Sequence, residues 1–277
     1  MKLTVLMDNT TIIDQPYIGE SGLSFLIETE DETVIFDTGW TPLFLSNARK
    51  MGIDLTKASA VVISHGHSDH TGGLVALGKL MKRAGKKAPL VLHPLSLEKK
   101  WWANKNGKIE EIGIPVEKNS IEAYFKLLPT VQPKKIGRSL LFLGEIPRPE
   151  GEQPEAIGFV VNAENQRIPD YLKDDSALVY EGRDGLVVIT GCSHSGVPNL
   201  LRYVNDLYPG EKIRALIGGF HMLSREENWL AVESEKIKEF EPETIYPCHC
   251  TDEASRCFLR KEFCTGVLGV GRVFTFE

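Results

Sequence analysis

Short apolar runs separated by turn residues dominate the amino-terminal third of the chain and predict strands with helices between them. Residues 2–8 form one such run, and residues 23–40 hold two runs joined by an acidic turn, which predicts a hairpin. Residues 41–52 have a proline near their start and a glycine at their end, a pattern typical of a helix. A strand at 61–64, rich in β-branched side chains, then leads into a helix at 74–85.

The carboxyl-terminal half has the same order of strands followed by helices. An apolar hairpin turns at Arg183-Asp184-Gly185, and a helix, a strand, an amphipathic helix, a short strand, a helix and a final strand follow it. We expect these elements at 176–191, 197–210, 212–222, 225–240, 243–250, 252–263 and 271–276. The repeated order of β-rich and α segments indicates two similar halves.

The stretch from about 94 to 155 has weaker periodicity and several prolines. Within it, residues 120–128 predict a helix and residues 139–145 predict a strand. We interpret the stretch as an insertion that lies over the functional site rather than as an independent domain. The prediction is therefore a single domain, 1–277, with an insertion at about 94–155.

Composition narrows the class of protein. The chain has 277 residues, of which 42% are hydrophobic and 25% are charged, enough for a large buried core. Its formal net charge of −6, without a lysine-rich groove, argues against nucleic acid as a partner or as the substrate of a phosphodiesterase. The amino terminus turns polar too early for a signal peptide, and no apolar run is long enough for a membrane span. The odd number of cysteines, 5, indicates reduced thiols, so we expect a cytoplasmic protein, whose oligomeric state the sequence leaves open.

The densest candidate chemistry lies in the stretch VVISHGHSDHTGGL, residues 61–74. It places His65, His67, Asp69 and His70 where a predicted strand ends and a helix begins, which is where ligands bind in α/β folds. Neutral imidazoles and carboxylates at such short spacing are the ligands that a zinc-like ion prefers. The stretch therefore predicts a metal site.

Four further predicted strands end in a turn that brings polar side chains. These side chains are Asp37, Cys192 with His194, His221, and His249 with its neighbours Cys248 and Cys250. Because strand ends on one edge of a layer converge, we expect His194 and His249 to be metal ligands, whereas a lone histidine such as His221 is more often structural. Asp37 either orients a ligating imidazole or caps its turn. Cys192 is either a soft thiolate ligand or a buried free thiol.

In chain order, the segments FDTG, HGHSDHTGG, GCSH and YPCHC resemble the metallo-β-lactamase superfamily, over most of the chain. The segments DNT, GEIPR and TGCSHSG resemble one branch of it. That branch includes a methanopterin-pathway synthase, which joins a dihydropterin to a ribofuranosyl-aminobenzene phosphate, and proteins described only as metal-dependent hydrolases. The resemblance implies an α/β fold, a four-layer αββα sandwich with the insertion over a dinuclear metal site at one edge.

The resemblance also implies the ligand sets. It assigns His65, His67 and His194 to the first metal, and it assigns Asp69, His70 and His249 to the second. The ions are two divalent transition metals, zinc in most members and iron or manganese in others. The sequence departs from the family at two places that carry ligands. The pair Gly191-Cys192 stands where many members have a glycine and a bridging aspartate, and Asp174-Asp175 lie where the third histidine is usual.

These features predict a metal-dependent hydrolase, or a synthase-like enzyme, that acts on a small phosphorylated or pterin-like molecule. Asp69 is expected to be a ligand or the base beside an activated water, and His221 to be an acid, a base or an oxyanion donor. Arg148 and Glu145 are expected to contact an anionic substrate. The alternative is a metal-based redox or electron-transfer protein that uses the carboxyl-terminal cysteines, although their C-x-C-x6-C-x6-C spacing matches no familiar cluster motif.

Overall fold

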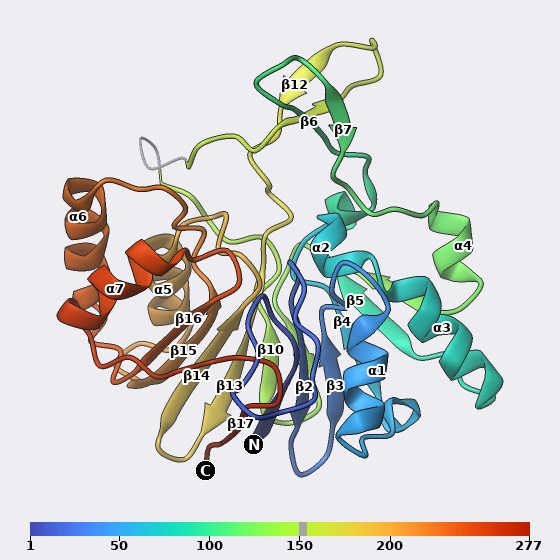
Figure 1. The fold of residues 1–277 in the computed structure, drawn as a ribbon, viewed down its shortest axis with the longest axis horizontal. Helices are drawn as coiled ribbons and strands as arrows, with labels where there is room; N and C mark the ends of the chain where they lie inside the picture. The colour runs from blue at the N-terminus through green and yellow to red at the C-terminus, as the bar shows by residue number, and fades with distance from the viewer. Residues whose placement is uncertain (150–153) are drawn as a thin grey trace.

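The computed structural model describes residues 1–149 and 154–277 and has four layers, in the order helix, sheet, sheet, helix (Figure 1). On one outer face lie α1 (Leu43–Lys50) and α3 (Leu74–Arg83). On the other outer face lie α5 (Val197–Leu207), α6 (Glu227–Lys238) and α7 (Glu253–Glu262). This arrangement confirms the predicted αββα sandwich.

The first sheet has seven strands. In spatial order they are β17 (Val273–Thr275), β1 (Lys2–Met7), β2 (Ser24–Glu28), β3 (Thr33–Phe36), β4 (Ala60–Val62), β5 (Pro89–Leu92) and β8 (Lys126–Pro129). The pairs from β17 to β3 are antiparallel, whereas those from β3 to β8 are parallel. The carboxyl ends of β3, β4 and β5 therefore lie at the same edge.

The second sheet has six strands. In spatial order they are β16 (Ile245–Cys248), β15 (Ile213–Gly219), β14 (Gly185–Thr190), β13 (Ala177–Gly182), β10 (Leu140–Phe142) and β9 (Lys134–Ile136). The strands β14, β15 and β16 run parallel to one another, so their carboxyl ends also share an edge.

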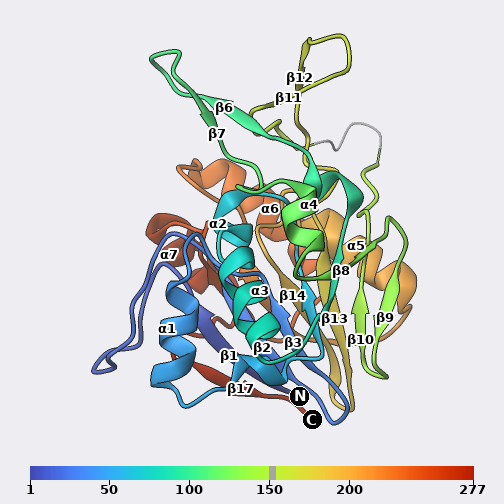
Figure 2. The same cartoon turned by 90° about the vertical axis from the view of Figure 1, so that its right-hand side faces the viewer.

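A small sheet of four strands projects beyond the sandwich at the end where α2 (Ser68–Thr71) lies (Figure 2). Its strands, in spatial order, are β12 (Arg167–Pro169), β11 (Phe159–Val161), β6 (Trp101–Ala103) and β7 (Ile109–Glu111). Residues 94–155, predicted as one insertion, are distributed over all three sheets, because β8 joins the first sheet and β9 and β10 join the second. Residues 150–153 of that stretch lie outside the described part of the chain.

Three apolar clusters hold the layers together. The cluster between the two large sheets includes Phe25, Phe36, Phe142, Leu178 and Ile217, all of them fully buried. One further cluster packs α1 and α3 against the first sheet, and the other packs α5, α6 and α7 against the second. Strands covered on both faces bury every side chain, which is why they appear in the sequence as continuous apolar runs.

The predicted elements are confirmed in kind and order along most of the chain, with one correction. The helix expected at 120–128 is α4 (Lys118–Glu122), which ends early, and β8 follows it. Residues Leu127 and Leu128 of β8 pair with Leu90 and Val91 of β5, so sheet pairing outweighs the local helical pattern there. Two 3-10 turns, Leu55–Lys57 and Pro94–Leu97, complete the regular structure. Within the described ranges, no helix combines the length and apolar character needed to cross a membrane.

Candidate metal centre

Polar side chains from both large sheets meet at the edge where the parallel strands end. The loop after β4 supplies His65 and His67, and α2 supplies Asp69 and His70. From the second sheet, the loop after β14 supplies His194 and the turn after β16 supplies His249. All five histidines are buried. The convergence expected from the sequence is therefore present.

These six residues form two donor groups. In the first donor group, His65, His67 and His194 bring one ligand atom each to within 4.8 Å of the others. In the second donor group, Asp69, His70 and His249 do the same. The Nε2 atoms of His70 and His249 lie 3.2 Å apart, and Asp69 Oδ2 lies 3.3 Å from His249 Nε2.

Buried ring nitrogens without protein partners show that the first donor group fits a metal ion. His67 Nε2 and both ring nitrogens of His194 are buried and have no hydrogen-bond partner among residues 1–149 and 154–277. An unpaired buried polar atom costs about 1–3 kcal/mol. Several such atoms converging on one point are what a divalent ion bound by imidazoles requires.

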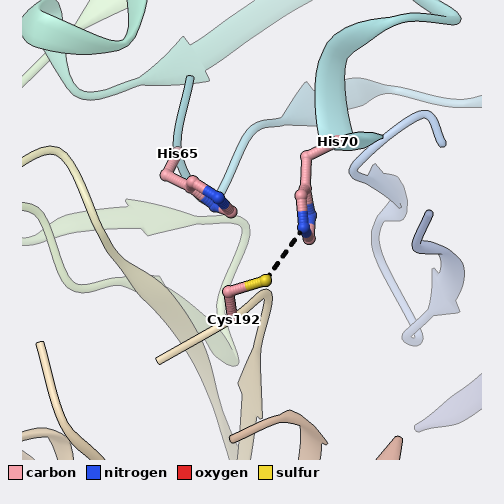
Figure 3. A group of neighbouring side chains, drawn as sticks. All are labelled: His65, His70 and Cys192. Atoms are coloured by element: carbon pink, nitrogen blue, oxygen red, sulfur yellow. Dashed lines mark hydrogen bonds between the residues drawn. The ribbon is translucent and has the colours of Figure 1, made fainter. Parts of the chain in front are cut away.

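Cys192 lies between the two donor groups. Figure 3 shows its thiol directed toward His70 with His65 alongside, and Cys192 Sγ lies 3.2 Å from His70 Nε2. The three residues bring one ligand atom each to within 4.8 Å of the others. The thiol thus occupies the place where the family resemblance puts a bridging aspartate, and its role as a ligand stays a prediction.

Asp37, at the end of β3, orients the imidazole of His70. Its Oδ2 lies 2.7 Å from His70 Nδ1, which leaves Nε2 directed into the second donor group. The same carboxylate accepts hydrogen bonds from the backbone N–H of Ser64, at 2.8 Å, and from its hydroxyl, at 2.7 Å. Asp37 therefore lies where it orients the His70 imidazole, and its other bonds hold the loop after β4 at Ser64 rather than cap its own turn.

His249 is held in a similar way by two residues near the amino terminus. Asp8 Oδ1 accepts the backbone N–H of His249 at 2.9 Å, and Asn9 Oδ1 lies 2.9 Å from His249 Nδ1. Neither residue was expected at the site from the sequence. The sequence singled out Asp8 and Asn9 only as part of the DNT segment of the resemblance. No local pattern connects them with His249, which lies near the other end of the chain.

The pair Asp174-Asp175, just before β13, holds both loops of the first donor group. Asp174 Oδ2 accepts the N–H of Gly66, which separates two of the ligands, at 2.7 Å. Asp175 Oδ2 accepts the N–H and hydroxyl of Ser195, at 2.8 and 2.7 Å, next to His194. Lys100 Nζ, buried in the loop before β6, bonds Asp174 at 3.0 Å and Asp170 at 2.8 Å.

The backbone is strained in the turns that follow the strands ending at the donor groups. Asp37, Ser193, His221 and His249 all have left-handed φ values, of 59°, 54°, 50° and 50°. Non-glycine residues in this region cost about 1–3 kcal/mol each and concentrate at functional sites. Each of the four directly follows, or lies close after, a strand that ends at the donor groups.

Burial and the neighbouring carboxylates set the charge of the imidazoles. Burial holds the pKa of His65 and His194 well below the usual range and lowers the pKa of His67 to about 4. These rings are therefore neutral at neutral pH, the form that binds a metal. Burial opposes protonation of His70 as well, but the carboxylates of Asp37 and Asp69 raise its pKa to about 9.

A cavity of about 750 Å³ opens over the donor groups. Asp69, His67, His194 and His249 form part of its lining. Apolar and aromatic side chains also line it, together with the carboxylates of Glu110 and Glu111. The apolar and aromatic residues are Trp40, Trp102, Ile112, Pro115, Ile157 and Leu223. No lysine or arginine of the described ranges lines it. The cavity therefore suits a molecule with flat or apolar parts that reaches the donor groups at one end.

Of the three residues predicted to contact or act on substrate, one lines the cavity and two lie outside it. His221 lines the cavity, and its ring packs against that of His194 with centroids 4.3 Å apart. Arg148 does not line the cavity, because its guanidinium donates to the backbone carbonyls of Tyr171 and Leu172. Glu145 is also outside it and lies 3.5 Å from His93 Nε2. The substrate contacts of Arg148 and Glu145 stay predictions that these positions do not support.

The carboxyl-terminal cysteines do not gather into one cluster. Cys248 and Cys250 are buried, whereas Cys257 and Cys264 are exposed. Of the cysteines in the described ranges, only Cys192 and Cys250 belong to a group of metal-ligating side chains. The geometry thus gives no support to the redox alternative that would use all four.

Similar proteins are found over nearly the whole chain. The sequence model described as Metallo-beta-lactamase superfamily matches residues 17–249. The 7,8-dihydropterin-6-methyl-4-(beta-D-ribofuranosyl)-aminobenzene-5'-phosphate synthase of Methanocaldococcus jannaschii is 25% identical over 95% of this chain and 92% of the synthase. An uncharacterized protein of the same organism is 29% identical over 90% of each chain. Tm1679, a metal-dependent hydrolase of the beta-lactamase superfamily, has a crystal structure that is 30% identical, with a TM-score of 0.84, over 99% of this chain and 98% of that one.

The first prediction concerns metal content. Protein purified without a chelator should carry at least two transition-metal ions per chain, and His67→Ala should lose one or both, because water cannot replace a clustered ligand without a large loss of affinity. Elemental analysis gives the count. His93→Asn is the matched control, since His93 lies outside the donor groups and its Nδ1 accepts the N–H of Leu95, a contact that asparagine can keep. Full metal content in His67→Ala would contradict the assignment.

The second prediction concerns Lys100. Lys100→Met should lower the free energy of unfolding by about 3–5 kcal/mol, because it leaves two buried carboxylates without their cation. It should also weaken metal binding by about 10- to 100-fold, since Asp174 positions the loop that carries the ligands. Lys99→Met, which removes an exposed lysine that pairs with Glu117, is the control and should change both far less. Denaturant unfolding and metal titration measure the two effects, and equal values for both variants would refute the positioning role.

Proposed function

The chain belongs to the metallo-β-lactamase superfamily, and from this premise we propose that it is a metal-dependent hydrolase with a dinuclear centre. The observation that carries the proposal is the pair of donor groups at the floor of one cavity, which His67, His194, Asp69 and His249 line. The two groups are His65, His67 and His194, and Asp69, His70 and His249. Two divalent transition metals, zinc first among them and iron or manganese as alternatives, match this set of imidazoles and one carboxylate. Such ions, when bound, supply Lewis acidity and lower the pKa of water toward neutrality.

Residues of the chain itself complete the donor groups, orient the imidazoles and accept protons. Asp69 Oδ2 lies 3.3 Å from His249 Nε2, and Asp69 also lines the cavity, so its carboxylate can both complete a donor group and accept a proton from a molecule in the cavity. The contacts of Asp37, Asn9 and Asp174 hold the imidazoles and their loops in place before substrate arrives. Imidazoles and loops that are held in place in this way need no rearrangement when a reaction begins.

The substrate that fits the cavity best is a small molecule with a flat ring and an anionic group, such as a phosphorylated or pterin-like compound. Trp40 and Trp102, 53% and 41% exposed, offer two indoles at the outer wall for a flat ring. Because the described lining has no lysine or arginine, an anionic group would be held at the metal centre rather than by a guanidinium.

A second candidate reaction is a synthase-like condensation. It is favoured by the similarity to the Methanocaldococcus jannaschii synthase, which extends over 95% of this chain. The replacement of a bridging carboxylate by Cys192 also favours it, since the departure falls where hydrolytic members have aspartate. Both reactions use the same centre and cavity, so they differ in the second substrate, which is water in one case and an organic molecule in the other.

The third prediction tests the function. Metal-loaded protein should convert a compound from a panel of phosphomonoesters, phosphodiesters, lactones and a dihydropterin that carries a leaving group, offered together with a ribofuranosyl-aminobenzene phosphate. Activity should fall at least about 100-fold in Asp69→Asn, because the proton acceptor is lost. Product analysis in isotopically labelled water separates the two reactions, since only hydrolysis incorporates oxygen from the solvent. A metal-loaded protein inactive on every class would contradict the proposal.

The fourth prediction concerns the aromatic wall. Trp102→Ala should raise KM about five- to tenfold and leave kcat nearly unchanged, because ring stacking is worth about 1 kcal/mol and lies away from the reacting atoms. Trp229→Ala is the matched control, since Trp229 is exposed to a similar degree, 37%, but does not line this cavity. Steady-state kinetics on the active compound measure both. A fall in kcat alone would place Trp102 nearer to the chemistry than the structure does.

A further inference from the structure

A third group of metal-ligating side chains lies beside the two donor groups. Cys192, His221 and Cys250 bring one ligand atom each to within 4.8 Å of the others. The three residues follow three neighbouring parallel strands, β14, β15 and β16, so the second sheet alone supplies them. Neither Cys250 nor His221 is needed to complete the dinuclear centre.

Backbone atoms of neighbouring turns and a glycine surround the sulfur atom of Cys250. The backbone N–H of His221 donates to Cys250 Sγ at 3.2 Å, and Cys250 Sγ lies 3.7 Å from the carbonyl oxygen of Cys192. A Cβ on Gly219 would lie 2.6 Å from Cys250 Sγ, so the thiol fills the space that a side chain would need. His221 Nδ1 is buried and has no hydrogen-bond partner in the described part of the chain.

Packing in an apolar cluster accounts for the burial of Cys248, but it does not account for the burial of Cys192 and Cys250. Cys248 belongs to the apolar cluster between the two large sheets, as a buried free cysteine commonly does. Cys192 and Cys250 belong to none of the three apolar clusters, and both line the cavity together with His221. The group is therefore reached from solvent through the same cavity as the dinuclear centre.

We propose that Cys192, His221 and Cys250 form a third metal position that takes a thiophilic ion such as zinc. Two thiolates and one imidazole are a softer set of donors than the histidines and carboxylate of the other groups, and they favour zinc over magnesium, calcium or manganese. Cys192 is shared, because its sulfur also lies 3.2 Å from His70 Nε2, and a thiolate can bridge two ions. The proposal goes beyond the dinuclear enzyme and assigns roles to Cys250 and His221.

The fifth prediction tests this position with cobalt as the probe. Metal-free full-length protein titrated with Co²⁺ should bind about three ions, and its spectrum should contain thiolate-to-cobalt absorption in the near ultraviolet. Cys250→Ala and His221→Asn should each weaken the binding of one ion by at least about 100-fold and leave the other two in place. Native mass spectrometry counts the ions, and the near-ultraviolet band of Cys250→Ala should be weaker.

Cys248→Ala is the matched control, because it removes a buried thiol two positions away that faces the core between the sheets. It should keep about three ions and the full thiolate band, as the donor set is unchanged. A parent protein that binds only two ions, or a Cys250→Ala variant that keeps the parent's count and band, would overturn the third position and leave the dinuclear proposal intact. A His221→Asn variant that keeps every ion but loses turnover would also overturn it, and would assign His221 to proton transfer instead.

Discussion

The close packing of imidazoles in one buried pocket is the constraint on which the rest of the site depends. The ring centroids of His65 and His70 lie 4.3 Å apart, and those of His67 and His194 lie 4.9 Å apart. Burial favours the neutral form of most of these rings, and neutral rings at such distances are stable only when each nitrogen has a defined partner. Where the protein supplies a partner on one nitrogen, as Asp37 does for His70, the other nitrogen is directed to the centre.

The sandwich meets this constraint by ending parallel strands of both large sheets at one edge. The apolar clusters hold the two large sheets in place relative to each other. Short strained turns at the strand ends then direct the polar side chains toward one another. The site is also coupled to the small sheet. Lys100, in the segment that leads into β6, bonds the carboxylate of Asp174, which holds the loop of the first donor group at Gly66. The small sheet, which carries Trp102 of the cavity lining, and the loop that carries His65 and His67 are therefore joined through one buried ion pair.

Local patterns were enough to predict the order of strands and helices and the convergence of strand-end histidines such as His65 and His67, which are marked by spacing and by the apolar run before them. The four-layer sandwich and the division of the ligands into two donor groups came from the resemblance to the family. Contacts between distant segments were not predictable in this way. The bond between Asp8 and His249 joins residues 241 positions apart, and nothing in either neighbourhood indicates the other. The same is true of Lys100, whose loop has no regular period, and of Arg148, whose guanidinium serves the backbone rather than the cavity. Such pairs are set by how the layers pack, which a one-dimensional pattern does not record.

The main departure from the family pattern is Cys192, which stands where many members have a bridging aspartate, and the two side chains differ in size and softness. As a metal ligand, the Cys192 thiolate would carry the same single negative charge as the aspartate that the resemblance expects there, so the charge around the donor groups would be kept. Its sulfur is larger and softer than a carboxylate oxygen and would favour zinc and iron over magnesium and calcium. In the proposed third position, Cys250 adds a second sulfur beside His221 and would strengthen that preference. In the proposed third position, the preference for a soft metal would follow from the arrangement of the second sheet's strand ends, because Cys192, His221 and Cys250 follow β14, β15 and β16.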